Sequence, residues 1–100
     1  MEKRNPSYQL AEIQKQMRAV QDLRLTASAR AGLVALDWDD EVAVQIIQSL
    51  TSRNFYKSMT CYANSKIWQD VYHACHQKID LYIKFQRDDE GYFTISFKEL

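Results

Sequence analysis

The stretch FYKSMTCYANSKIWQDVY, residues 55–72, decides the fold, because the spacing of apolar side chains changes there from helical to strand-like. This alternation predicts two strands, over 55–62 and 66–72, joined by a short turn. The same stretch places Lys57 and Gln69 among aromatic side chains. Two interpretations follow: the strands only build a sheet, or they also line a site for a polyanion.

Two further strands are predicted downstream, over 81–86 and 92–98. The polar loop 87–91 ends in Gly91, which predicts an antiparallel hairpin. The alternation assigns one apolar face to Leu81, Ile83, Phe85, Phe93, Ile95 and Phe97. It assigns the opposite face, left for solvent or a ligand, to Tyr82, Lys84, Thr94, Ser96 and Lys98.

The residues before this stretch have helical spacing. Asn5 as N-cap and Pro6 at the first helical position predict a helix over 6–21. A short helix interrupted at Gly32 is predicted over 27–36. A third helix should begin after Asp39 or Asp40 and end near Leu50, and 24–26 could form an edge strand. Helices packed on one face of a mainly antiparallel, twisted sheet make an α+β fold, in a single domain spanning 1–100.

Composition sets limits on location and partners. No run approaches the roughly 20 apolar residues of a membrane span, and the charged start MEKRNP lacks a secretory apolar region. These features predict a cytoplasmic protein with both cysteines reduced. The formal net charge is zero, but six Lys or Arg stand against two Asp between Arg53 and Arg87. A basic face is therefore compatible with the neutral total.

The chain has no Gly-rich phosphate loop and no H-E-x-x-H, C-x-x-C or G-x-S-x-G motif, so we expect no cofactor. Its richest set of metal-ligand types is Cys61, His73, Cys75 and His76. Because these four have no standard zinc spacing, we expect no metal site.

The strand half does hold the side chains that metal-free RNA cleavage needs. That reaction requires a group that takes the 2'-hydroxyl proton, donors for the charge on phosphorus, and an acid for the departing 5'-oxygen. Exposed aromatic rings add stacking surfaces worth about 1–3 kcal/mol per base. A non-catalytic RNA-binding or protein-interaction module on the same face, and a purely structural subunit, remain alternatives.

Five segments carry a resemblance to a known family: MEKRNP at 1–6, FYKSMT at 55–60, IWQDVY at 67–72, YIKF at 82–85 and SFKEL at 96–100. On these the chain resembles the motility quorum-sensing regulator (MqsR) family of toxins. The resemblance implies a RelE-like ribonuclease fold and an mRNA interferase that cuts single-stranded RNA at GCU-like triplets without a ribosome. It also implies a cognate antitoxin with a zinc-binding N-terminal domain and a helix-turn-helix DNA-binding domain.

The resemblance implies that Lys57, Gln69 and Tyr82 are the catalytic residues. Lys57 would stay cationic and stabilise the phosphorane, Tyr82 would protonate the leaving oxygen, and Gln69 would orient the phosphate or a base. The expected RNA-binding residues are Tyr56, Met59, Trp68 and Lys84.

The general base is left open. His73 and His76 have the required imidazole, but the segments shared with the family contain neither of them. Residues 74–78 and 88–91 match no family segment.

Overall fold

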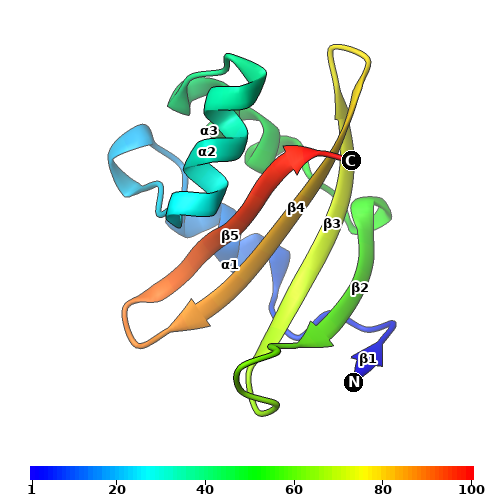
Figure 1. Cartoon of the computed structure of the whole chain (residues 1–100). Coiled ribbons are helices and arrows are strands. Elements are labelled where there is room, and N and C mark those ends of the chain that lie inside the picture. The colour runs from blue at the N-terminus through cyan, green and yellow to red at the C-terminus, as the bar shows by residue number, and fades with distance from the viewer.

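The computed structural model describes all 100 residues and places three α-helices against a five-stranded antiparallel sheet (Figure 1). The strands are β1 (Glu2–Lys3), β2 (Phe55–Thr60), β3 (Trp68–His76), β4 (Ile79–Asp88) and β5 (Gly91–Glu99), neighbours in that order. The helices are α1 (Leu10–Gln16), α2 (Ala27–Leu36) and α3 (Asp40–Ser49), with 3-10 turns η1 (Val20–Asp22) and η2 (Ser52–Asn54). The predicted α+β architecture is confirmed.

The core lies between the helices and one face of the sheet. The three helices and strands β3–β5 contribute most of its apolar side chains, among them Ile13, Met17, Leu33, Ile46, Ile47, Tyr72, Leu81, Ile83, Phe85 and Phe97. The other face of β2–β5 is open, and it faces the viewer in Figure 1. Since no helix covers it, this open face is available to a ligand.

Helices α2 and α3 begin where the sequence predicts. The side chain of Thr26 accepts a hydrogen bond from the Ala29 amide at 3.1 Å, and Asp39 accepts one from the Val42 amide at 3.1 Å. The predicted interruption at Gly32 is wrong, because α2 continues through it. A Cβ atom there would lie 1.8 Å from the carbonyl oxygen of Phe97, so the glycine allows α2 to approach β5 closely.

The first predicted helix is wrong at both ends, since α1 covers only Leu10–Gln16. The buried carboxylate of Asp70 holds the preceding segment: it accepts hydrogen bonds from the Ser7 amide at 3.0 Å, the Tyr8 amide at 2.9 Å and the Ser58 hydroxyl at 2.6 Å. Because the amides of Ser7 and Tyr8 bind this distant carboxylate, the segment before α1 lies against the sheet and does not begin a helix at Pro6.

The β3–β4 hairpin extends past the predicted end of the strand, so that β3 continues to His76. Its turn consists of Gln77 and Lys78, both with positive φ (51° and 66°). Neither is the Gly or Asn that normally marks such a turn, which explains why the sequence does not predict it. The predicted edge strand at 24–26 is reduced to one parallel bridge, between Leu25 and Thr94.

The assignment of faces in β5 is partly wrong. The β4–β5 pairing shifts, so that Lys84 lies opposite Ser96 but Phe85 lies opposite Thr94. The irregularity at Ile95 turns Thr94 into the core, where its hydroxyl donates to the Met17 sulfur at 3.9 Å. Thr94 therefore does not belong to the open face.

None of the helices is both long enough and apolar enough to cross a lipid bilayer.

Candidate active site

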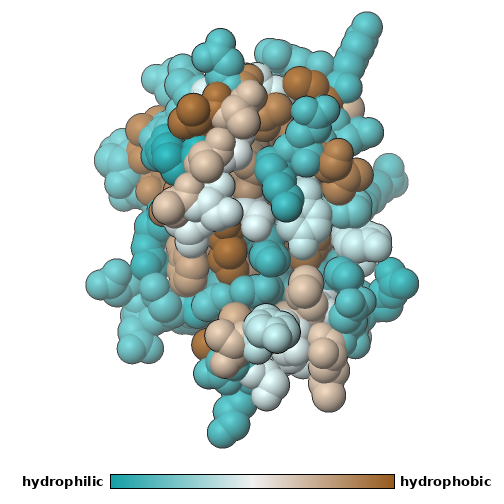
Figure 2. Space-filling view, viewed as in Figure 1, coloured by the Kyte–Doolittle hydropathy of each residue, from teal (hydrophilic) through white to brown (hydrophobic).

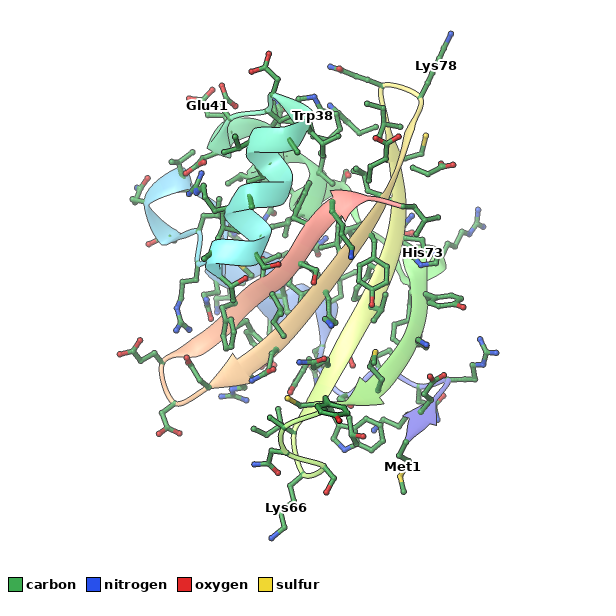
Figure 3. All side chains as sticks on the ribbon, viewed as in Figure 1. Met1, Trp38, Glu41, Lys66, His73 and Lys78 are labelled. Atoms are coloured by element: carbon green, nitrogen blue, oxygen red, sulfur yellow. The ribbon has the colours of Figure 1, made fainter.

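The open face gathers polar and aromatic side chains from every strand. Figure 2 shows mostly hydrophilic and intermediate residues over the strands on this side, and Figure 3 shows His73 projecting there from β3. The register places these side chains together: Tyr56, Lys57, Met59, Gln69, His73, Tyr82, Lys84, Gln86, Ser96 and Lys98. Six of the seven predicted site residues are in this group.

An irregularity in β2 brings Tyr56 and Lys57 to the same face. Phe55 pairs with Tyr72 on the core side, while Lys57 pairs with Val71, so Tyr56 is the extra residue between them. Consecutive strand residues normally point to opposite faces, but a bulge allows both to point outward. The Tyr56 ring is thereby free to stack on His73, with centroids 4.1 Å apart and planes 18° from parallel.

Lys57 is held by a carboxylate from the N-terminal strand. Its Nζ donates to Oε2 of Glu2 at 2.9 Å, because β1 pairs with β2 and sets Glu2 opposite Met59. This hydrogen bond raises the pKa of Lys57 and lowers the pKa of Glu2. At neutral pH the pair is therefore an ammonium and a carboxylate, and Lys57 is suited to charge stabilisation rather than proton abstraction.

Tyr82 lies between aromatic and cationic neighbours on β4. Its ring centroid is 6.0 Å from that of His73, and Nζ of Lys98 lies 5.4 Å above the ring. Burial raises the pKa of the Tyr82 phenol, with Lys57 opposing the shift. The phenol is therefore protonated at neutral pH and can donate a proton or a hydrogen bond.

Gln69 and Lys84 occupy the centre of the open face. The Gln69 side-chain amide donates to Oε1 of Gln86 at 2.9 Å and is 7 % exposed, so its position is fixed. Burial, followed by the charge of Lys98, lowers the pKa of Lys84. A bound anion would relieve this repulsion between lysines.

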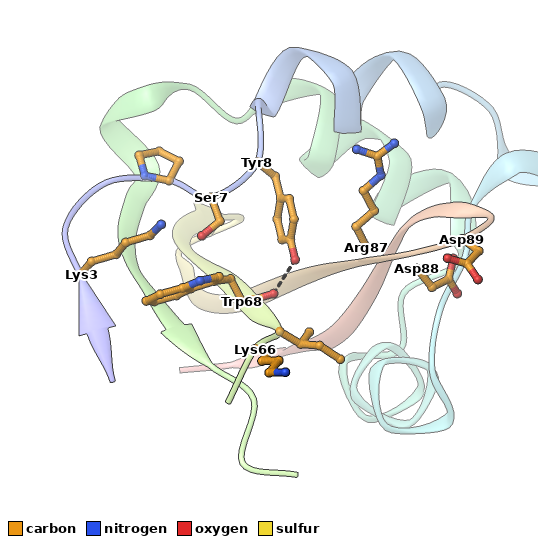
Figure 4. Close-up of a pocket in the computed structure, with 10 residues that line it drawn as sticks. Lys3, Ser7, Tyr8, Lys66, Trp68, Arg87, Asp88 and Asp89 are labelled. Atoms are coloured by element: carbon orange, nitrogen blue, oxygen red, sulfur yellow. Dashed lines mark hydrogen bonds between the residues drawn. The ribbon is translucent and has the colours of Figure 1, made fainter. Parts of the chain in front are cut away.

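Trp68 is separated from the other predicted site residues. It precedes Gln69 on a regular strand and so points to the helix-covered side, where Nζ of Lys3 lies 4.2 Å from its ring centroid. There it lines a pocket of about 730 Å³ beside Tyr8, whose hydroxyl donates to the Trp68 carbonyl at 2.6 Å (Figure 4). Trp68 and Lys57 therefore point to opposite faces of the sheet.

The four potential metal ligands do not converge. His73 faces the open side, whereas His76 packs edge-on against Trp38 on the covered side, with centroids 5.1 Å apart. No group of three His, Cys, Asp or Glu side chains is placed to hold a metal ion.

Three residues outside the seven predicted site residues join the site. Glu2 had no signal, because a two-residue strand has no periodicity and its partner lies more than fifty residues away. Lys98 was expected on the open face, and the structure places it over Tyr82. His73 was one of two candidate bases, and only the tertiary structure separates it from His76.

The arrangement suits an RNA phosphate. It offers three lysines for negative charge, a protonated phenol, a fixed amide and an imidazole, with an aromatic ring beside them.

The chain matches a family model and a curated relative. The family model described as "Motility quorum-sensing regulator, toxin of MqsA" matches residues 5–99. A curated relative from Escherichia coli (strain K12), named "mRNA interferase toxin MqsR", is 36% identical over 99 residues, covering 99% of this chain and 99% of the relative. Both matches span the strands that carry Lys57, Gln69 and Tyr82.

Proposed function

Because the chain belongs to the motility quorum-sensing regulator toxin family and is therefore an endoribonuclease, we propose that it cuts single-stranded mRNA at GCU-like triplets without a metal ion or a ribosome. The 2'-oxygen of the substrate attacks the adjacent phosphorus, and the 5'-oxygen of the next nucleotide leaves. The products are a 2',3'-cyclic phosphate and a 5'-hydroxyl end.

The observation that carries this proposal is the meeting of Lys57, Gln69 and Tyr82 on one open face, although they come from three different strands. Lys57, with its raised pKa, keeps a positive charge for the phosphorane. Tyr82, with its raised pKa, keeps a proton for the leaving oxygen. Gln69 cannot titrate and orients the phosphate or a base through its fixed amide.

The RNA strand contacts Tyr56, Met59 and Lys84 around these three residues. Tyr56 offers a partly exposed ring for base stacking, and Lys84 offers positive charge. Trp68 is not part of this contact, because it lies on the covered side.

The family model names the chain's relatives as toxins of an antitoxin, so this protein has an antitoxin partner. We assign that partner a zinc-binding N-terminal domain and a helix-turn-helix DNA-binding domain, and we assign the toxin itself a RelE-like fold and a cytoplasmic location. Zinc then belongs to the partner and not to this chain.

The test is to incubate purified, antitoxin-free protein with a long mixed-sequence RNA in excess EDTA and to map every new 5' end. We expect discrete cuts that share a triplet. The Lys57→Met variant removes the charge at similar volume and should cut at least about 100-fold more slowly, with an unchanged circular dichroism spectrum. The Tyr82→Phe variant should also be slow, since it keeps the ring but loses the proton.

Intact RNA after prolonged incubation with folded wild-type protein would contradict the proposal and favour a non-catalytic RNA-binding module. If folded Lys57→Met cuts at the wild-type rate, the role of Lys57 is rejected and the proposed function is not.

A further inference from the structure

The proposed cleavage lacks one group, the base that removes the 2'-hydroxyl proton. Glu2 is the carboxylate beside Lys57, but their hydrogen bond lowers its pKa and makes it a weak base. Tyr82 would first have to lose a proton that burial makes harder to remove. Lys57 is an ammonium at neutral pH, because its hydrogen bond to Glu2 raises its pKa. None of these three groups is suited to the task.

His73 occupies the position that remains. Its ring lies between the two tyrosines, stacked on Tyr56 at 4.1 Å and 6.0 Å from Tyr82. Its strand is anchored next to η2, because the Asn54 side-chain amide donates to the His73 carbonyl at 3.1 Å. The imidazole is half-buried and forms no hydrogen bond through its ring nitrogens, so a nitrogen is free to receive a proton.

We infer that His73 is the general base of the cleavage reaction, an assignment that rests on the proposed function. An unprotonated ring nitrogen takes the 2'-hydroxyl proton while the bond from the 2'-oxygen to phosphorus forms. The bond from phosphorus to the 5'-oxygen breaks, and that oxygen takes the phenol proton of Tyr82. The imidazolium then returns its proton through water to the tyrosinate, so the protein ends unchanged.

Several titratable or charged groups surround this imidazole. They are Tyr56 and Lys57 on β2, Cys75 on β3, Tyr82 and Asp80 on β4, and Lys98 on β5. Arg53 belongs to η2, which contacts β3. Lys84 on β4 is the one rival base, because burial lowers its pKa. The test must therefore include both His73 and Lys84.

The experiment measures single-turnover cleavage of a short RNA carrying the mapped site, between about pH 5 and pH 8.5. Because imidazole accepts a proton only when neutral, the wild-type rate should rise with pH by up to about tenfold per unit in the acid range. The His73→Phe variant keeps a ring that can stack on Tyr56 but has no base. It should be about 10²- to 10⁴-fold slower and should lose this rise.

The control is His76→Gln, which removes the other imidazole of β3 from the covered face. It should keep both the rate and the pH profile if the protein remains folded. In a His73→Ala variant, added free imidazole should restore part of the rate, which a purely packing role would not allow.

A second substrate separates base from acid. An RNA with sulfur in place of the scissile 5'-oxygen has a leaving group that needs no proton. On this RNA, Tyr82→Phe should approach the wild-type rate, whereas His73→Phe should remain slow.

A His73→Phe variant that keeps the rate and the pH rise would overturn the assignment while leaving the proposed function intact. If Lys84→Met loses the increase of rate with pH while His73→Phe keeps it, the base is Lys84 and the assignment to His73 is wrong. Failure of the wild-type protein to cut either RNA would reject the proposed function and this inference together.

Discussion

At the scale of single residues, the pair of Lys57 and Glu2 affects how strongly the site can bind an anion. The Lys57 side chain is 21% exposed and that of Glu2 57%, so the pair is reached by water and by solute ions. A phosphate that approaches Lys57 must compete with the carboxylate already bound to it. Glu2 therefore positions Lys57 and, at the proposed site, should weaken its attraction for RNA.

We predict that Glu2→Gln binds RNA more tightly. The change removes a negative charge beside the phosphate, and the pKa of Lys57 falls toward its ordinary value, at which it is still cationic at pH 7. Because the ion pair is exposed to solvent and screened by it, the gain should be no more than about fivefold. Fluorescence anisotropy with a 2'-deoxy-substituted, uncleavable RNA measures it. Glu41→Gln, in the first turn of α3, is the control, and an equal gain there would indicate a general charge effect.

Individual residues also show where prediction from sequence works and where it stops. The alternation of Tyr82 and Lys84 with buried neighbours was predicted correctly, because it needs only the two-residue period. The same period places Trp68 and Gln69 on opposite faces, so the prediction that both belong to one site was inconsistent with the predicted strand. The shared face of Tyr56 and Lys57 depends on a bulge, for which the sequence carries no local signal.

At the scale of secondary structure elements, α2 and β5 are in contact with no side chain between them at Gly32. This contact sets the distance between the helical layer and the strand that carries Lys98. It involves backbone atoms, which cannot move aside as a flexible side chain would.

We predict that Gly32→Ala destabilises the protein, although alanine favours helices more than glycine does. A Cβ atom 1.8 Å from the Phe97 carbonyl oxygen must push α2 away from β5. Overpacking of this kind costs about 1–3 kcal/mol, which urea unfolding measures. Ser28→Ala, on the exposed side of the same helix, should be neutral or slightly stabilising. Equal stability of Gly32→Ala and wild type would contradict the close approach.

The β4–β5 hairpin is joined to the helical layer by an ion pair. The Arg24 guanidinium donates to Asp88 at 2.7 Å and lowers the pKa of that carboxyl to about 2. A carboxyl with a lower pKa in the folded state stabilises the fold above its unfolded pKa, about 3.9. That contribution is lost as the pH falls toward 2.

We therefore predict that Asp88→Asn flattens the acid side of the stability profile. Wild-type protein should lose stability between about pH 4 and pH 2, and Asp88→Asn should lose less over the same interval while being less stable at pH 7. Urea midpoints at pH 7, 4 and 2.5 measure this. Asp89→Asn, the next residue in the turn, should behave as wild type, and a matching change in both variants would argue against the Arg24 pairing.

The elements that were predicted correctly are those with local signals. Capping side chains mark the starts of α2 and α3, and Gly91 marks the β4–β5 turn. The first helix was misjudged because the amides of Ser7 and Tyr8 bind Asp70, more than sixty residues away. Such a contact exists only once the sheet has formed.

At the scale of the whole molecule, the charges that sum to a formal zero are unevenly placed. Acidic residues of the helical side and of the hairpin are paired with arginines, as in Arg30 with Asp40 and Arg24 with Asp88. The open face carries Lys57, Lys84 and Lys98. The proposed attraction for RNA therefore rests on these lysines and not on the overall charge.

We predict a modest but definite salt dependence of RNA binding. Three lysines that each neutralise one phosphate give a slope of about −2 in a plot of log affinity against log salt for single strands. Lys98→Gln should reduce the slope by about 0.7, whereas Lys15→Gln, on α1, should not change it. A slope near zero, or an equal effect of Lys15→Gln, would place the RNA elsewhere on the protein.

The order of elements along the chain has a consequence for synthesis on the ribosome. All three helices precede β2, and the open face is assembled from residues 55–99, with Lys98 reaching Tyr82 only when β5 pairs with β4. Glu2 is synthesised before β2, and it has no partner until β2 follows more than fifty residues later. A nascent toxin therefore carries no assembled site while most of its own message is still being translated, and it becomes able to cut RNA only as its last strand emerges.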